Sequence, residues 1–194
     1  MEALDRPELI HRGLALERTT LAWNVVGVVV LAFAAITARS VALGAFGIDS
    51  VIEIGASTVV LWELSGTGEA RQRLGLRIIG IAFLALALYV SVQSTFDLVA
   101  RFHPHHSPVG LGWTAATAVV MFLLAAGKER TGEALENPVL QKEGRVTFAD
   151  GLLASAVLTG ILLNTVAGWW WADPAAGYVI LVYGVKEGWA ALRV

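Results

Sequence analysis

The sequence contains no cysteine. Disulfide bonds are therefore excluded, and so are metal sites built from thiolate ligands. A metal site in this chain has to be built from other side chains, of which the carboxylates are the first to consider.

Charged residues are also scarce. They make up 15% of the 194 residues, whereas a typical soluble domain contains about 25%. Hydrophobic residues, by contrast, make up 56%. This balance predicts an integral membrane protein that lies almost entirely within the lipid bilayer. The chain has no basic stripe with interleaved aromatic residues, so nucleic acid is not expected as a partner.

Six apolar segments each supply about 20 residues, the length that a membrane-spanning helix needs. They lie at 20–37, 41–62, 76–99, 109–126, 148–169 and 174–192. A polar N-terminal segment (1–18) precedes them, and the longest connection is a polar loop at 127–147. We therefore predict an all-α membrane protein with six transmembrane helices, in which residues 1–194 form a single transmembrane domain.

The basic residues are divided unequally between the two ends of these segments. All but two of the 14 Lys and Arg residues fall at the end that carries both termini, and the exceptions are Arg39 and Arg101. Because cytoplasmic segments are enriched in Lys and Arg, both termini and the loop at 127–147 are predicted to be cytoplasmic. The short connections and compact chain favour a multi-pass protein of a bacterial inner (cell) membrane.

Asp49 and Glu53 lie four residues apart in the middle of the apolar stretch 41–61. One helical turn separates them, so both carboxylates point from one face of the helix. A carboxylate near the bilayer midplane costs about 2.5–3.5 kcal/mol on insertion scales, so two on one face indicate a cation between them. The alternative is that both face the protein interior and one of them is protonated.

Asp150, near the start of the fifth apolar segment, is the next candidate. Its alternative role is that of a surface residue at a helix N-terminus. Carboxylate oxygens suit magnesium, calcium or manganese, and zinc also accepts them. Three acids therefore predict a divalent cation without saying which one, and a proton relay or a sodium site would use the same residues.

Other polar residues of the apolar segments are expected to have structural roles. Asn24, Gln93 and Asn164 are expected to form interhelical hydrogen bonds rather than to bind a ligand. Asp97 is expected at the membrane interface, and Asp173 is expected to cap the N-terminus of the sixth helix.

A histidine cluster, His103, His105 and His106, lies between the third and fourth apolar segments. Histidine-rich tracts bind transition metals. A three-histidine loop is more often incidental, however, and the sequence leaves the role of this one open.

Residues 47–57, Gly-Ile-Asp-Ser-Val-Ile-Glu-Ile-Gly-Ala-Ser, resemble the second transmembrane helix of the cation diffusion facilitator family. That family has six helices and usually forms homodimers. Its site takes two acidic or histidine residues four apart on the second helix and, usually, His-x-x-x-Asp on the fifth. Asp49 and Glu53 match the first pair and Asp150 matches the Asp of the second, whereas the His position falls on Val146.

The valine at position 146 departs from the family pattern, because its side chain has no ligand atom. The resemblance then implies a weaker tetrahedral zinc site or a preference for harder ions, with Thr147, Asn24 or water as accessory ligands. The chain ends at Val194, so it looks most like the compact branch that lacks the family's cytoplasmic domain after the sixth helix.

The function implied by the resemblance is efflux of a divalent metal cation. Zinc is the first expectation, with manganese, iron or cobalt as alternatives, and protons are the expected counter-ion. The ion would enter from the cytoplasm, bind Asp49, Glu53 and Asp150, and leave outward when the carboxylates are protonated.

Two further readings stay open. The chain is alternatively a metal-binding membrane sensor or partner subunit that does not transport, which the valine at position 146 and the missing soluble domain favour. A purely structural bundle leaves Asp49 and Glu53 without explanation. An enzyme is not expected, because the sequence supplies no Ser–His pair, HExxH helix or CxxC pair.

Overall fold

The computed structural model describes residues 6–64 and 69–193, and this part of the chain forms six α-helices and no β-strand. The helices are α1 (Arg6–Ala38), α2 (Val41–Leu64), α3 (Glu69–Val99), α4 (Pro108–Ala134), α5 (Pro138–Ala167) and α6 (Ala172–Leu192). The prediction of an all-α protein is confirmed.

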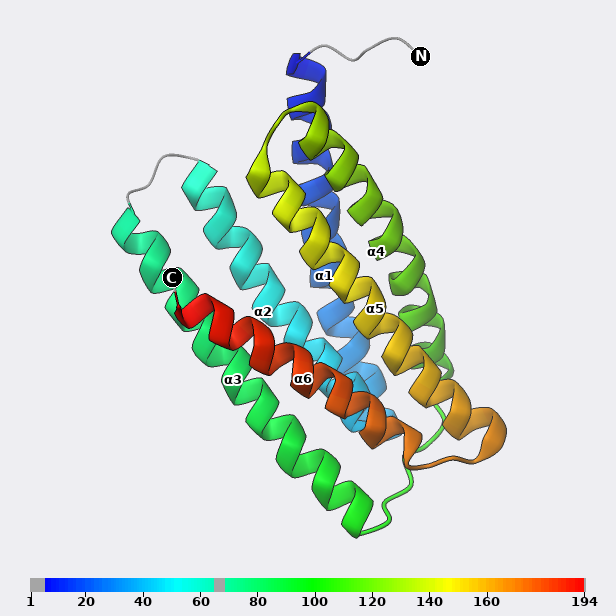
Figure 1. The fold of residues 1–194 in the computed structure, drawn as a ribbon. Coiled ribbons are helices and arrows are strands. Elements are labelled where there is room, and N and C mark those ends of the chain that lie inside the picture. The colour runs from blue at the N-terminus through cyan, green and yellow to red at the C-terminus, as the bar shows by residue number, and fades with distance from the viewer. Residues whose placement is uncertain (1–5, 65–68, 194) are drawn as a thin grey trace.

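Consecutive helices run in opposite directions along one bundle (Figure 1). Residues 39–40, 100–107 and 168–171 connect helices at one end, which we call the opposite end. The start of α1, the end of α6 and the turn at 135–137 lie at the other end, which we call the terminal end. Both termini of the described chain are therefore at the same end of the bundle.

Helix α2 lies at the centre of the packing. It contacts α1, α3, α5 and α6, whereas the most extensive helix pairs are α4 with α5 and α3 with α6. The position of α2 places its buried face, which includes Asp49 and Glu53, against the rest of the bundle. Side chains projecting from α2 therefore meet those of α5 in the interior.

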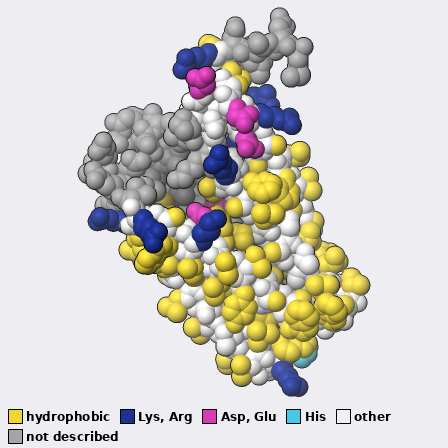
Figure 2. Space-filling model, viewed as in Figure 1, with side chains coloured by type: hydrophobic (Ala, Val, Ile, Leu, Met, Phe, Trp, Pro, Cys, Tyr) yellow, Lys and Arg dark blue, Asp and Glu magenta, His cyan; other side chains and the backbone are white. Residues whose placement is uncertain are grey.

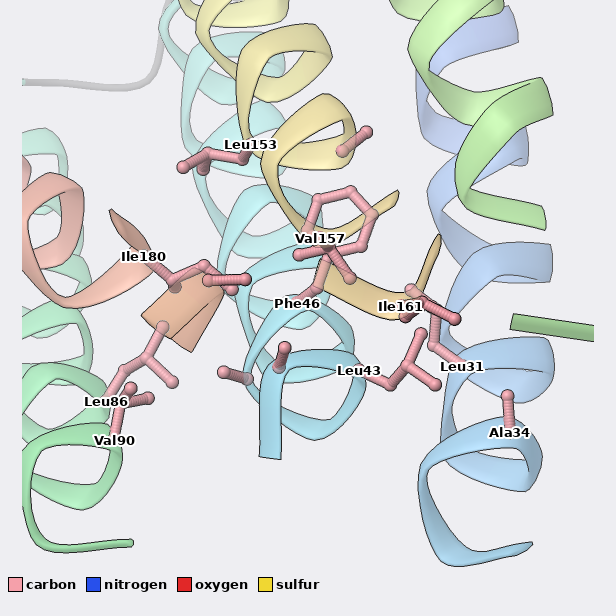
Figure 3. Close-up of a cluster of buried hydrophobic side chains, with 14 of the residues drawn as sticks. Leu31, Ala34, Leu43, Phe46, Leu86, Val90, Leu153, Val157, Ile161 and Ile180 are labelled. Carbon is pink, nitrogen blue, oxygen red and sulfur yellow. The ribbon is translucent and has the colours of Figure 1, made fainter. Parts of the chain in front are cut away.

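The apolar core lies mainly between mid-height and the opposite end of the bundle. Figure 3 shows Leu43 and Phe46 of α2 beside Val157 of α5, with Leu31 of α1 and Ile180 of α6 completing the cluster. All five side chains are buried. The main apolar cluster thus lies on that side of the acidic residues.

The outer surface of the bundle is largely apolar. Hydrophobic side chains cover most of the face seen in Figure 2, and basic residues gather mainly towards the terminal end. Four of the described helices are long and apolar enough to cross a membrane: α1, α3 from Arg77, α4, and α5 from Glu143. Spans by α2 and α6, and therefore the total of six, stay predictions.

The predicted loop at 127–147 is mostly helical. Helix α4 continues to Ala134 and α5 begins at Pro138, where proline is tolerated because the first helical N–H has no partner. Asn137 accepts a hydrogen bond from the backbone N–H of Leu140 and so caps α5. At Gly132 a Cβ would lie 2.8 Å from the backbone nitrogen of Gln141, so this close approach of the two helices needs glycine. The expected polar segment is also helical from Arg6 onward, as part of α1.

The sequence predicts that Asp173 caps the N-terminus of α6, and this prediction is wrong. Trp171 is the N-cap residue of α6 and makes no side-chain cap hydrogen bond. The buried Asp173 carboxylate instead accepts hydrogen bonds from the Ser40 hydroxyl and from the backbone N–H of Ala42, at the start of α2. Asp173 therefore joins the N-terminal ends of α6 and α2.

Two of the three expected interhelical hydrogen bonds are also absent from the described contacts. The Gln93 amide donates to Asp97 within α3, and this aspartate is buried in the protein near the end of the helix, where its position at the membrane interface stays a prediction. The Asn164 amide donates to the carbonyl of Pro104, in the connection between α3 and α4. The first pair is one helical turn apart, whereas the second joins residues 60 positions apart and therefore depends on tertiary packing.

Candidate metal site

Asp49, Glu53 and Asp150 meet at mid-height of the bundle, and we call them the three-carboxylate site. Each offers a carboxylate oxygen, and the three oxygens lie within 4.8 Å of one another. At 1.5 Å per residue, Glu53 lies about 18 Å from the start of α2 and Asp150 about 18 Å from the start of α5. The two helices begin at opposite ends of the bundle and run past each other, so Glu53 and Asp150 lie at a similar height between the two ends.

The three-carboxylate site is closed to solvent. Asp49, Glu53 and Asp150 are only 1%, 7% and 3% exposed, so water does not screen their charges. Among the described residues, no hydrogen-bond partner is found for either Asp49 oxygen, for Glu53 Oε1 or for Asp150 Oδ1. An unsatisfied buried polar group costs about 1–3 kcal/mol, and more when it is charged. The site is therefore suited to a cation or protons that satisfy these oxygens.

Asn24 of α1 is brought to the same site. Its Nδ2 donates a hydrogen bond of 3.1 Å to Glu53 Oε2, and the asparagine is buried. The expected interhelical hydrogen bond is thus present, and it links α1 to α2. The amide fixes one oxygen of Glu53 and leaves Oε1 without a partner among the described residues. Its role as an accessory ligand stays a prediction.

The hydroxyl of Thr147 has other partners, and the role of this residue as an accessory ligand stays a prediction. Thr147 lies about one turn before Asp150 in α5 and is buried. Its hydroxyl donates to the carbonyl of Glu143 and accepts a hydrogen bond of 3.1 Å from the Lys128 ammonium. The hydroxyl is therefore occupied in this conformation. Val146, beside it, is half-buried and supplies no ligand atom.

Lys128 is the residue near the site that the sequence reasoning missed. The sequence places Lys128 among the basic residues of the terminal end, where a lysine is expected to reach water. In the structure it is fully buried, at 0% exposed. Its Nζ lies 3.0 Å from both carboxylate oxygens of Glu17 and 4.0 Å from Glu143 Oε2. The helical spacing carried a signal, because Met121 and Leu124 precede Lys128 on the buried stripe of α4.

The three histidines do not form a metal site in the described part of the chain. His103, His105 and His106 are exposed, and the ring of His103 lies 5.2 Å from that of Trp170. Within the described residues, the group close enough to hold a metal ion consists of the three carboxylates and includes no histidine.

The sequence of this chain matches a known domain family and a curated protein. Residues 19–194 match the cation efflux transmembrane domain, a span that includes all six helices except about the first three and a half turns of α1. Transmembrane protein 163 of Xenopus laevis is 25% identical over 170 residues, which cover 81% of this chain and 60% of the relative. The chain therefore spans about three-fifths of the length of that curated relative.

Proposed function

Because the chain belongs to the cation efflux family, we propose that it exports a divalent metal cation through the three-carboxylate site. Members of this family are membrane proteins that transport divalent metal ions rather than enzymes. The observation that carries the proposal is the meeting of Asp49, Glu53 and Asp150 in the interior of an apolar bundle, with oxygens that have no hydrogen-bond partner in the described part of the chain.

The spacing of the carboxylates supports a bound ion. A zinc–oxygen bond is about 2.0–2.2 Å, so two oxygens on opposite sides of an ion are separated by about 4.4 Å at most. The three oxygens already lie within 4.8 Å of one another, so small side-chain rotations bring them to ligand distance. The hydrogen bond from Asn24 orients Glu53 for this role.

Proton exchange follows from the same geometry. Three carboxylates this close cannot all remain ionised in a buried site without a compensating positive charge. Either a divalent cation or protons supply that charge, and each displaces the other. A helix movement that opens the site to the side with more protons then releases the metal ion there. We therefore assign protons as the counter-ion.

Zinc is the cargo we propose first, with manganese, iron and cobalt as alternatives. The donors of the site are oxygens, which zinc accepts and manganese prefers. Val146 stands where an imidazole ligand would favour zinc more strongly. Comparing the transport rates of zinc and manganese therefore shows whether the missing imidazole at Val146 shifts the selectivity of the site towards harder ions.

For the arrangement in the membrane, we propose six spans with both termini in the cytoplasm of a bacterial-type inner membrane. The termini lie at the same end of the bundle, and the basic residues gather mainly at that end. We also propose a homodimer, which the family resemblance implies.

The decisive experiment is metal flux into proteoliposomes under a pH gradient, with zinc, manganese, iron and cobalt compared. We expect Asp49→Ala to abolish the flux of every ion that the unaltered protein transports, because it removes both unpartnered oxygens of one ligand. Glu129→Ala, which removes an exposed acid of α4, is the matched control and should transport normally. Normal flux through a folded Asp49→Ala variant contradicts the proposed mechanism.

A metal-binding sensor or partner subunit is the second candidate function. The absence of an imidazole at Val146 favours it, because the weaker ligand set is less able to capture and move an ion. Binding that depends on Asp49, together with no flux of any ion, would establish this alternative.

A further inference from the structure

A second set of polar residues, two of them fully buried and two partly buried, lies between the three-carboxylate site and the terminal end of the bundle. The ammonium of Lys128 is at its centre, 3.0 Å from both oxygens of Glu17. Glu143 Oε2 lies 4.0 Å away, and Thr147 Oγ1 accepts a hydrogen bond from the ammonium. We call these four residues the lysine tier. They join α1, α4 and α5 through one buried cation.

The lysine tier is stacked on the three-carboxylate site along two helices. Glu17 precedes Asn24 by seven residues in α1, and Glu143 precedes Asp150 by seven residues in α5. Seven residues are two helical turns, so each pair shares one face and is separated by about 10.5 Å along the axis. The lysine tier therefore lies between the terminal end and the site on the side of the bundle formed by α1, α4 and α5.

The direction towards the opposite end is closed by other means. There the buried side chains next to the site belong to the apolar core, with Phe46 of α2 facing Leu153 and Val157 of α5 (Figure 3). These apolar side chains oppose the passage of a hydrated cation, and the polar residues Ser40, Asp97 and Asp173 are buried only beyond them, near the opposite end. The polar contacts of the lysine tier thus form the barrier that can be opened by breaking ion pairs, without taking the core apart.

Stability alone does not account for a lysine at position 128. Its charge is fully desolvated, and a buried ion pair is often no more stabilising than apolar side chains of similar volume. Its neighbours on the stripe, Met121, Leu124 and Ala125, show that this face of α4 accepts apolar residues. What the lysine adds is a positive charge surrounded by carboxylate and hydroxyl oxygens, the donors that a divalent cation also uses.

We propose that Lys128 is the gate between the terminal end of the bundle and the three-carboxylate site. Its ammonium occupies the position, among the oxygens of the lysine tier, that a divalent cation occupies on its way to the site. In the closed form its charge neutralises Glu17 and repels an incoming cation. When the ammonium moves away, Glu17 and Glu143 bind the cation and deliver it two turns deeper, to Asp150. The identity of the cargo rests on the proposed function, whereas the closure by Lys128 is measurable without transport.

The absence of cysteine allows a direct test of closure. Thr147→Cys introduces a single thiol into the lysine tier itself, at the member that lies three residues before Asp150. The rate at which this thiol reacts with a small cationic methanethiosulfonate reagent is measured on purified protein in detergent. The rate is compared between the Thr147→Cys protein and the same protein that also carries Lys128→Gln. We expect the rate to rise by at least about tenfold in the glutamine variant, because the charge of the barrier is lost.

Arg130→Gln is the matched control, since it removes one positive charge from an exposed position of the same helix. It should leave the thiol reaction rate unchanged. Lys128→Met, which keeps the length of the side chain and tolerates burial, replaces the glutamine variant if that protein does not fold. Equal thiol rates in the Lys128 protein and in a folded, uncharged variant overturn the gate.

Metal binding gives a readout that a purely structural ion pair would not change. Titration calorimetry with zinc and with manganese is carried out with the native threonine at position 147. We expect Lys128→Gln to bind about tenfold more tightly than the unaltered protein, because a repelling charge near Asp150 is removed. Unchanged or weaker binding by the folded variant contradicts the gate. If the unaltered protein binds neither ion, the proposed function fails, and the thiol rates still decide whether Lys128 closes the route.

Discussion

The sequence predicts the orientation of two of the three carboxylates better than that of the third. The two are Asp49 and Glu53, and the third is Asp150. The spacing of Asp49 and Glu53 in an apolar helix is sufficient to predict that both face one direction. Asp150 offered no such pair, and by position alone it was equally consistent with a helix N-terminus at the surface. Its burial, at 3% exposed, and its approach to the other two carboxylates depend on the packing of α5 beside α2.

At the same scale, Asn24 positions a ligand rather than supplying charge. We expect Asn24→Ala to weaken metal binding by about 2–10-fold, since it removes one hydrogen bond to Glu53, worth about 0.5–1.5 kcal/mol. Titration calorimetry measures the change. Asn164→Ala removes a comparable amide that binds the Pro104 carbonyl instead and should leave binding unchanged. Equal losses in the two variants would mean that Asn24 acts only through stability.

At the scale of the elements, small residues set how closely the helices approach. α3 and α6 meet at Gly80 and Gly188, where a Cβ on Gly188 would lie 2.9 Å from the carbonyl oxygen of Gly80. Such close packing without bulky side chains is typical of helices within membranes. The start of α6 is held beside the start of α2 by a different contact, the hydrogen bond between Asp173 and Ser40. The sequence shows many glycines but does not show which of them face another backbone.

We therefore expect Gly188→Ala to lower the free energy of unfolding by about 1–3 kcal/mol, because the methyl group meets backbone atoms that cannot move aside. Gly112→Ala is the matched control, since its Cβ would meet nothing within 4 Å and alanine favours the helix. Thermal unfolding in detergent compares the two. A Gly188→Ala protein as stable as the unaltered one would show that α3 and α6 separate easily.

At the scale of the whole molecule, the main apolar cluster and the buried lysine lie on opposite sides of the three-carboxylate site, and Ser40 and Asp173 are buried beyond the cluster. The core around Phe46 and Val157 lies towards the opposite end, whereas Lys128 and its glutamates lie towards the terminal end. The three-carboxylate site lies at the boundary between them. A cation at this boundary joins α2 to α5, so its binding should stabilise the fold as a whole.

This linkage predicts a metal-dependent and pH-dependent melting temperature. At a metal concentration of 100 times Kd the stabilisation is about 2.7 kcal/mol, and it should shrink as the pH falls, because protons displace the metal ion from its carboxylates. Thermal unfolding with and without zinc or manganese, across a pH series, measures both effects. Asp49→Ala should lose the metal-dependent shift while it keeps a cooperative transition. A shift of equal size in that variant would place the metal ion elsewhere.

The sequence by itself determined the all-α class, the family and the acidic pair of α2. Each of these depends on features that are local along the chain, namely long apolar segments, a four-residue spacing and the run 47–57. It also located the starts and ends of the helices to within a few residues, except where polar segments such as 127–147 continue as helix beyond the apolar stretch.

The tertiary structure alone decided which distant residues share the interior. Lys128 is separated from Glu17 by 111 residues, and Ser40 from Asp173 by 133, so no local pattern connects them. A lysine at the end of an apolar segment usually reaches water, and only the packing of α1 and α5 around α4 forces this one to find carboxylates inside. Burial and pairing of charge depend on which helices are neighbours, and neighbours are chosen by packing rather than by sequence order.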